Sequence, residues 1–258
     1  MTKRISTKEN WDEFWIRKHR VEDVYDNTDR IITNLTQITE LNGKQILEVG
    51  AGTARDSFAM IDAGADVFVL DYSMPAFHII KRLNQQRSSG VYPILADTFK
   101  IPVAENTFDI VFHQGLLEHF TNPVELLKEN VRVLKKDGLL LVDVPQRYHI
   151  YTVIKHILIF LNKWFAGWET EFTIRELESL VEQSGAQVVH RYGDWMRPSL
   201  FYRMVRELLL KIKIKLPLYP NGFGPLRRIR DKIRNRWIVR KWAFYTFLDI
   251  GIIASKNE

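Results

Sequence analysis

The sequence lacks cysteine entirely: none of its 258 residues carries a thiol. This absence excludes disulfide bonds, thiolate-bound zinc, iron–sulfur clusters and every mechanism that uses a thiol nucleophile. A chain without cysteine fits a reducing compartment, and we therefore expect a cytoplasmic location.

Long apolar runs are missing as well. Residues 1–10 (MTKRISTKEN) begin basic, but no apolar run follows them, so we expect no secretion signal. The most apolar stretch, residues 150–168, contains Lys155, His156 and Lys163 and is a poor candidate for a membrane span. The composition, with 46% hydrophobic and 26% charged residues, is that of a globular protein with a sizeable core.

Positive charge is concentrated in one segment. Residues 203–241 contain 13 Lys and Arg against two acids, Glu207 and Asp231, which is a local net charge of +11. Because the whole chain has a formal net charge of +6, the remaining residues carry a net charge of −5. The basicity is therefore a property of this segment and not of the whole fold.

Short apolar segments alternate with amphipathic stretches through the middle of the chain, which is typical of a parallel α/β sheet. We expect strands at 45–50, 66–71, 91–97, 107–114, 138–145, 186–195 and 244–254. We expect helices at 11–19, 29–39, 54–63, 74–86, 122–134, 148–165 and 173–184. Thr173 and Glu176 have the spacing of a capping box at the start of the last helix.

Acids and glycines follow the first strands, at the edge where open α/β sheets bind ligands. Gly50 and Gly52 let the backbone approach a ligand closely, and Glu48 suits a cationic group. Asp71 ends the second strand, where it can accept hydrogen bonds from two ribose hydroxyls. Asp97 ends the third strand and can accept from an exocyclic amine, so an adenosine-type ligand would satisfy both carboxylates.

A dinucleotide is disfavoured as that ligand. The dinucleotide fingerprint requires Gly or Ala three residues after the second glycine, whereas this chain has Arg55, which would crowd a pyrophosphate. A dehydrogenase is therefore a weaker interpretation.

With these residues, the chain resembles the class I S-adenosylmethionine-dependent methyltransferases, in particular their type 11 branch. The matching motifs cover about residues 45–145 and are ILEVGAGTARDS (46–57), VFVLDYS (67–73), ADTFKIPVAENTFDIVFHQGLLEHF (96–120) and VLKKDGLLLVDVP (133–145). The resemblance implies a Rossmann-like fold with seven strands in the order 3-2-1-4-5-7-6, the last strand being antiparallel. It implies S-adenosyl-L-methionine as cofactor.

The resemblance also implies which residues hold this cofactor: Glu48, Gly50, Ala51, Gly52, Asp71, Tyr72, Asp97, Thr98, His113 and Gln114. The first strand would hold the methionine moiety, Asp71 the ribose hydroxyls, and Asp97 with Thr98 the adenine. Each carboxylate also has a purely structural interpretation: Glu48 can pair with Arg55, Asp71 can be a turn residue, and Asp97 can cap the following segment.

Methyl transfer from a sulfonium is a direct displacement, so the protein mainly aligns the acceptor and excludes water. If the acceptor must lose a proton, His113 is our candidate base near the sulfonium, while His119 has a structural interpretation. The missing thiol excludes the covalent route to carbon-5 methylation of pyrimidines. The sequence after the fourth strand, residues 113–116 (HQGL), differs from the Asn/Asp-Pro-Pro-aromatic box of family members that methylate amino groups of nucleic acids or protein glutamines.

The single domain that we expect, residues 1–258, consists of N-terminal helices (1–44), a cofactor-binding core (45–147) and two insertions. Residues 148–170 would form a lid, or else an apolar acceptor tunnel or a membrane contact. Residues 198–242 combine apolar stripes with basic residues, which is typical of helices on anionic membrane surfaces. A solvated surface, an anionic ligand such as RNA and a dimer contact are alternatives for this segment, although apolar interleaving disfavours RNA.

These observations predict a methyltransferase that acts on an oxygen or nitrogen of a small or lipid-linked acceptor. A protein that binds the cofactor without transferring the methyl group is an alternative. The oligomeric state is not indicated by the sequence.

Overall fold

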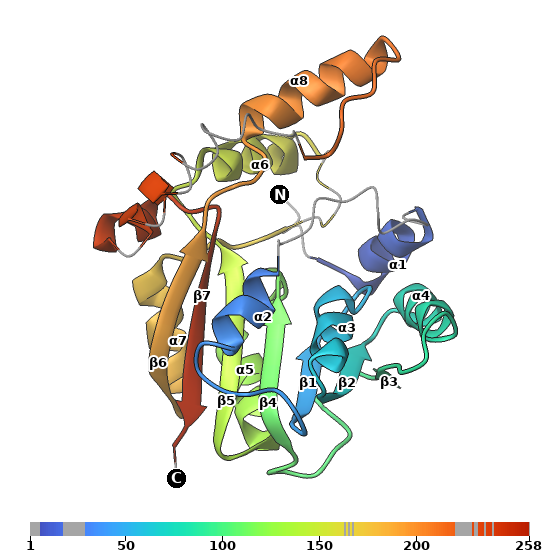
Figure 1. Cartoon of the computed structure of the whole chain (residues 1–258), viewed down its shortest axis with the longest axis vertical. Helices are drawn as coiled ribbons and strands as arrows, with labels where there is room; N and C mark the ends of the chain where they lie inside the picture. Colours follow the sequence, from blue (N-terminus) through green and yellow to red (C-terminus); the bar gives the residue numbers. More distant parts are fainter. Residues whose placement is uncertain are drawn as a thin grey trace.

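In the computed structural model, seven strands form one sheet in the order β3-β2-β1-β4-β5-β7-β6 (Figure 1). The structure describes residues 6–17, 29–162, 164, 166, 168–219, 229, 232–234, 236–238 and 240–257. The strands are β1 (Gln45–Val49), β2 (Asp66–Asp71), β3 (Tyr92–Leu95), β4 (Phe108–Gln114), β5 (Leu134–Pro145), β6 (Ala186–Asp194) and β7 (Asp249–Lys256). Strand β7 runs antiparallel to both β5 and β6, and the expected topology is therefore confirmed.

Helices cover both faces of the sheet. They are α1 (Lys8–Arg17), α2 (Arg30–Leu35), α3 (Arg55–Asp62), α4 (Met74–Asn84), α5 (Pro123–Val133), α6 (Ile150–Phe160), α7 (Ile174–Gln183) and α8 (Leu200–Lys211). Short 3-10 helices, η2 (Leu117–His119) and η3 (Lys241–Tyr245), complete the described elements. One apolar cluster includes side chains of α2, α3 and α4, and the other includes side chains of α5 and α7. Burial on both faces explains why the central strands are almost continuously apolar.

The capping box predicted at α7 is confirmed: the Thr173 side chain accepts from the Glu176 N–H, and the Glu176 carboxylate accepts from the Thr173 N–H at 2.8 Å. The predicted start of the last strand at residue 244 was wrong. Phe244 lies in η3, and strand β7 begins only at Asp249. Phe244 and Phe247 pack edge to face, and their spacing of three residues suits a tight helical turn rather than a strand.

Two other expectations are tested only in part. The helix expected at 11–19 starts earlier, at Lys8, and its last residues lie outside the described part of the chain. The apolar stripe noted at 226–240 lies partly outside the described residues too, since 220–228 are not among them.

A buried ion pair ties α2 to the carboxyl edge of the sheet. The Arg30 guanidinium donates to both carboxylate oxygens of Asp143 in β5, at 3.0 and 2.7 Å, and to Asp249 in β7 at 2.9 Å. The Arg30 side chain is 8% exposed and that of Asp143 1% exposed. Such a pair adds little net stability, but either partner left alone would be a buried uncompensated charge.

We expect Arg30→Met to lower the free energy of unfolding by about 3–5 kcal/mol, because Asp143 would lose its counter-ion while staying buried. Urea denaturation measures this loss. The double variant Arg30→Met/Asp143→Leu should recover much of it, since the fully buried charge is gone and only Asp249, whose side chain is 20% exposed, loses its counter-ion. A loss below about 1 kcal/mol in the single variant would contradict this account.

Helices α6 and α8 lie at the upper end of the molecule in Figure 1, beyond the carboxyl ends of the parallel strands. Both expose apolar side chains there. Within the described residues, no helix has the length and apolar character needed to cross a membrane.

Candidate functional site

A cavity of about 430 Å³ opens at the carboxyl ends of β1, β2 and β4. This is the size range of small-molecule and cofactor sites. The cavity is lined by Ser6, Trp11, Trp15, Glu48, Gly50, Ala51, Gly52, Thr53, Arg55, Asp56, Asp71, Tyr72, Asp97, Thr98, Phe99, Gln114, Gly115, Leu116, His119 and Phe120. All the expected cofactor residues except His113 lie in this wall.

The loop after β1 brings backbone to the cavity. Gly50 and Gly52 have φ values of +69° and +55°, a backbone conformation that residues with a side chain rarely adopt. A Cβ atom on Gly52 would lie 2.5 Å from the Trp15 ring, and one on Gly50 would lie 2.7 Å from Leu116. The two glycines therefore permit both the turn and the close packing of the cavity walls.

Asp71, at the end of β2, is held by main-chain groups from two directions. Its Oδ2 accepts from the Gly52 N–H and its Oδ1 from the Ser73 N–H, each at 2.8 Å. Burial raises the pKa of Asp71, although the N–H groups of Ser73 and Gly52 oppose this shift. Asp71 has the hydrogen bonds of a turn residue, and its carboxylate also lines the cavity, where its remaining lone pairs can accept from a ligand.

Glu48 lies in β1 with its side chain almost fully buried, and its carboxylate accepts a hydrogen bond from the Ser57 hydroxyl. Burial and the neighbouring Asp56 raise the pKa of Glu48 well above its ordinary value, although the hydrogen bonds from Ser57 oppose the shift. The ion pairs among the described residues do not include the alternative Glu48–Arg55 pair. A buried carboxylate without a cationic partner among the described residues suits a cationic ligand.

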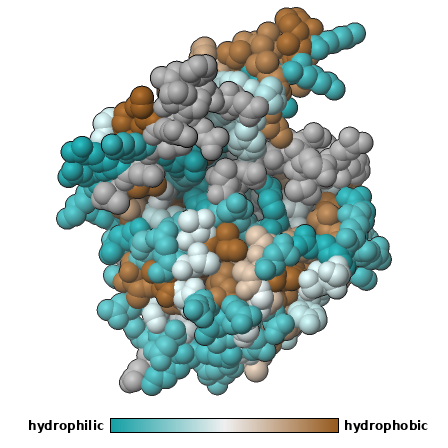
Figure 2. All heavy atoms as spheres, in the orientation of Figure 1, coloured by the Kyte–Doolittle hydropathy of each residue, from teal (hydrophilic) through white to brown (hydrophobic). Residues whose placement is uncertain are grey.

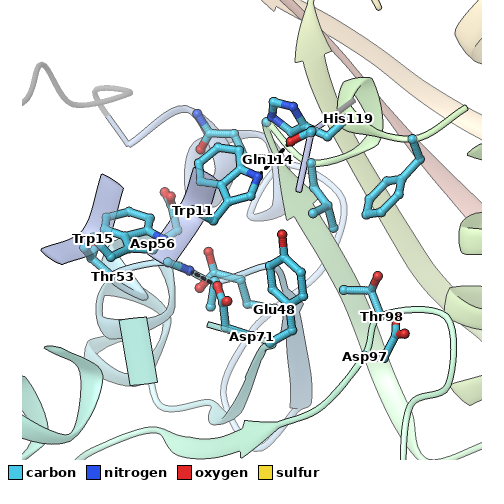
Figure 3. A pocket seen from close by; sticks show the side chains of 18 of the residues that line it. Trp11, Trp15, Glu48, Thr53, Asp56, Asp71, Asp97, Thr98, Gln114 and His119 are labelled. Atoms are coloured by element: carbon cyan, nitrogen blue, oxygen red, sulfur yellow. Dashed lines mark hydrogen bonds between the residues drawn. The ribbon is translucent and has the colours of Figure 1, made fainter. Parts of the chain in front are cut away.

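Asp97 and Thr98 lie on one side of the cavity, with Glu48 and Asp71 between them and the tryptophans of α1 (Figure 3). Asp97 is exposed and caps its own turn, because its Oδ1 accepts from the Phe99 N–H at 2.9 Å. Phe99 and Phe120 pack edge to face near this side, with ring centroids 4.9 Å apart. The capping role expected as an alternative for Asp97 is thus present together with its place in the cavity wall.

The placement of His113 beside the cofactor was wrong. His113 is fully buried, does not line the cavity, and neither ring nitrogen has a hydrogen-bond partner in the described structure. Burial lowers its pKa to about 3, so it is a weak base. Residues alternate between the two faces along a strand, so Gln114 reaches the cavity while His113 points elsewhere.

His119 lies in the cavity wall instead, in η2. Its Nδ1 is buried without a hydrogen-bond partner among the described residues, and burial lowers the pKa of the imidazole, which favours the neutral form. Its ring packs edge to face against Trp11, with centroids 4.9 Å apart. A neutral imidazole at this place can accept a proton.

Helix α1 contributes Trp11 and Trp15 to the wall, and the sequence pattern did not indicate this. An aromatic residue in an N-terminal helix more often packs in a core, and α1 lies far from the motifs in sequence. The Gly52–Trp15 contact that reveals its place exists only in three dimensions.

The region of the expected lid is joined by a hydrogen bond to the part of the cavity wall that contains His119. The Lys155 ammonium of α6 is buried and lies 2.6 Å from a Glu169 oxygen and 2.7 Å from a Glu171 oxygen. The N–H of Thr170, between these two acids, donates to the carbonyl of Glu118 at 2.8 Å. The end of this region, at Thr170, is therefore anchored directly beside His119.

The chain is similar to known methyltransferases in sequence and in fold. Residues 47–142 match the model of a family described as "Methyltransferase domain" (type 11). Over 100 residues the chain is 36% identical to a demethylmenaquinone methyltransferase of Renibacterium salmoninarum, covering 39% of this chain and 40% of that protein. Over 162 residues it is 27% identical to a ubiquinone biosynthesis O-methyltransferase of Roseobacter denitrificans, covering 60% and 65%.

Among solved structures, magnesium protoporphyrin IX methyltransferase from Synechocystis with bound SAH superposes with a TM-score of 0.58. The alignment covers 89% of this chain and 81% of that one at 12% identity, so it concerns the fold alone. The chain spans less than half the length of the first curated relative described above.

Over residues 47–142 the chain matches a methyltransferase domain model, and its strand order and cavity are those expected for a class I S-adenosylmethionine-dependent methyltransferase. The structure fits the cofactor: the loop at Gly50 and Gly52 forms a close main-chain cradle, and Glu48 and Asp71 offer carboxylates for its cationic and hydroxyl groups.

We expect the affinity for S-adenosylhomocysteine, which retains a cationic amino group, to rise with pH as Glu48 loses its proton. Because the pKa of Glu48 is raised, lowering the pH protonates its carboxylate and removes the charge that attracts the cation. Titration calorimetry at several pH values, in buffers of different ionisation enthalpy, measures both the affinity and the proton release.

Glu48→Gln is the matched control, and it should bind more weakly and show a flatter dependence on pH. An unchanged slope in this variant would assign the pH dependence to another group.

Proposed function

We propose that this protein transfers a methyl group by direct displacement from S-adenosyl-L-methionine to an oxygen or nitrogen of a small or lipid-linked acceptor. The observation that carries this proposal is the cavity in which Glu48, Asp71, Asp97 and the glycine loop meet. The names of the two relatives support an acceptor of the quinone-precursor class.

Each part of the cavity has a distinct task in this proposal. When bound, S-adenosyl-L-methionine supplies a methyl group on a positively charged sulfur. Glu48 and Asp71 bind and orient its polar groups, while Trp11 and Trp15 exclude water from the cavity. His119 replaces His113 as the candidate base: for a hydroxyl acceptor, its neutral imidazole in the cavity wall would take the proton.

Two alternatives remain distinguishable by experiment. A protein that binds the cofactor without transfer would show binding and no turnover. A methyltransferase for RNA or another anionic acceptor would use the basic segment, residues 198–242, to hold its substrate.

The decisive measurement is turnover of S-adenosylmethionine to S-adenosylhomocysteine with a panel of aromatic hydroxyl and amine acceptors. We expect wild type to bind the cofactor and to turn it over with an acceptor of this panel. Asp71→Ala should weaken cofactor binding by about 1.5–3 kcal/mol for each hydrogen bond lost to the carboxylate. Unchanged affinity in Asp71→Ala would contradict its assignment.

His119→Asn separates binding from transfer. It should keep cofactor affinity near wild type and lower turnover by about 10²–10⁴-fold with a hydroxyl acceptor, the usual contribution of a general base. Equal turnover by His119→Asn and wild type would show that His119 takes no proton.

We further propose that the basic segment contacts an anionic membrane surface. Apolar side chains recur along α8 at Phe201, Met204 and Leu208, and at Ile212 directly after the helix; they are 55–77% exposed. Figure 2 shows hydrophobic residues gathered over this helix at the upper end of the molecule, next to hydrophilic side chains. Helix α6 exposes a second apolar stripe, at Ile150, Val153, Ile157 and Phe160.

The basic side chains around α8 differ in their availability. Arg203 and Arg206 donate to main-chain carbonyls nearby, whereas Lys211, Lys213 and Lys215 are exposed. An exposed apolar stripe flanked by lysines favours an anionic bilayer, where each lysine contributes about 1 kcal/mol.

Replacing the three lysines with Gln should weaken binding to phosphatidylserine-containing vesicles by roughly 100-fold, because about 1 kcal/mol is lost for each charge. Vesicle co-sedimentation measures this change. The control removes the same charge elsewhere, at Lys81, Lys100 and Lys128, and should bind like wild type. Equal binding of wild type to neutral and anionic vesicles would overturn the membrane proposal.

A further inference from the structure

Ser73 connects the cavity to the N-terminal helix. It is fully buried, and its N–H donates to Asp71 Oδ1 at 2.8 Å. Its hydroxyl donates to Asp12 Oδ1 in α1 at 2.6 Å, and its Oγ accepts from the Ala76 N–H as the N-cap of α4. One serine thus joins the end of β2, the start of α4 and helix α1.

The contact with Asp12 holds α1 against the cavity. Helix α1 packs on α4 and places the Trp15 ring over Gly52, whose N–H donates to the other oxygen of Asp71. Helix α1 therefore contacts both residues whose N–H groups donate to the Asp71 carboxylate: Trp15 packs on Gly52, and Asp12 accepts from Ser73. Neither Asp12 nor Ser73 lines the cavity, so any effect on a ligand must pass through other residues.

We propose that Asp12 and Ser73 are positioning residues of the cofactor site, an inference that rests on the function proposed above. The Asp12–Ser73 hydrogen bond orients the Asp71 carboxylate toward the ribose hydroxyls and keeps the tryptophans of α1 over the cavity. Helix α1 is thereby a part of the cofactor site, and it is held there by the Asp12 carboxylate, which does not line the cavity.

The hydrogen bond from Ser73 explains how a second carboxylate, that of Asp12, can lie close to Asp71. Asp12 and Asp71 carry like charges on two sides of Ser73, and Asp12 contributes to the raised pKa of Asp71, although burial is the main cause. Charge alone would therefore disfavour Asp12 beside Asp71, whereas the hydroxyl between them gives Asp12 a favourable partner. An asparagine at position 12 would keep an oxygen that accepts from Ser73 and would remove the charge repulsion with Asp71.

The test measures the affinity of S-adenosylhomocysteine by titration calorimetry for wild type, Asp12→Ala and Asp12→Asn. We expect Asp12→Ala to bind about tenfold more weakly, the lower end of what one hydrogen bond to a charged group contributes. Asp12→Asn should stay within about threefold of wild type, because its amide oxygen can still accept from Ser73. Ile16→Ala, on the exposed side of the same helix, is the matched control and should bind like wild type.

A second ligand tests whether the effect passes through Asp71. The 2′-deoxy analogue of S-adenosylhomocysteine lacks a hydroxyl that Asp71 is expected to bind, so the penalty of Asp12→Ala should be smaller for this analogue. A helix that merely packed less well would weaken both ligands equally. If Asp12→Ala does not fold, Asp12→Gln, which displaces the acceptor by one methylene, takes its place.

Three outcomes would overturn the proposal: an affinity of Asp12→Ala within twofold of Ile16→Ala, an equal loss in Asp12→Asn, or an equal penalty for both ligands. No binding by wild type would overturn the proposed function and this inference with it. Binding by wild type that is lost in Asp71→Ala but kept in Asp12→Ala would overturn this inference alone.

Discussion

The two main-chain hydrogen bonds to the Asp71 carboxylate connect most of the site. They join the glycine loop after β1 to the start of α4, so that the ends of two strands share one acceptor. Because buried N–H groups must be paired, neither the loop nor the turn at Ser73 can shift without leaving a donor unsatisfied.

The residues that could be predicted from the sequence are those whose position depends on topology. Parallel strands end at one edge, so Glu48, Asp71 and Asp97 had to approach one another once the strand order was expected. The capping box at Thr173 and the antiparallel last strand are likewise local or family-wide features, and the structure confirms them.

The sequence could not indicate to which face of the sheet a side chain points, nor which distant segments come into contact. His113 and Gln114 are neighbours in β4, but only Gln114 reaches the cavity, because successive side chains of a strand point to opposite faces. Lys155 interrupts an apolar stretch of the sequence, yet it is buried between Glu169 and Glu171, where its charge is paired. The contribution of Trp11 and Trp15 to the cavity depends on how α1 packs, which no local pattern encodes.

The separation of charge within the chain has a physical consequence for how the molecule moves. A segment with a net charge of +11 on a body with a net charge of −5 produces a large electric dipole. Helix α8 lies at the same end as the carboxyl edge of the sheet (Figure 1). A negatively charged surface would exert a torque on this dipole during approach, before any contact forms, and would turn the basic segment toward itself.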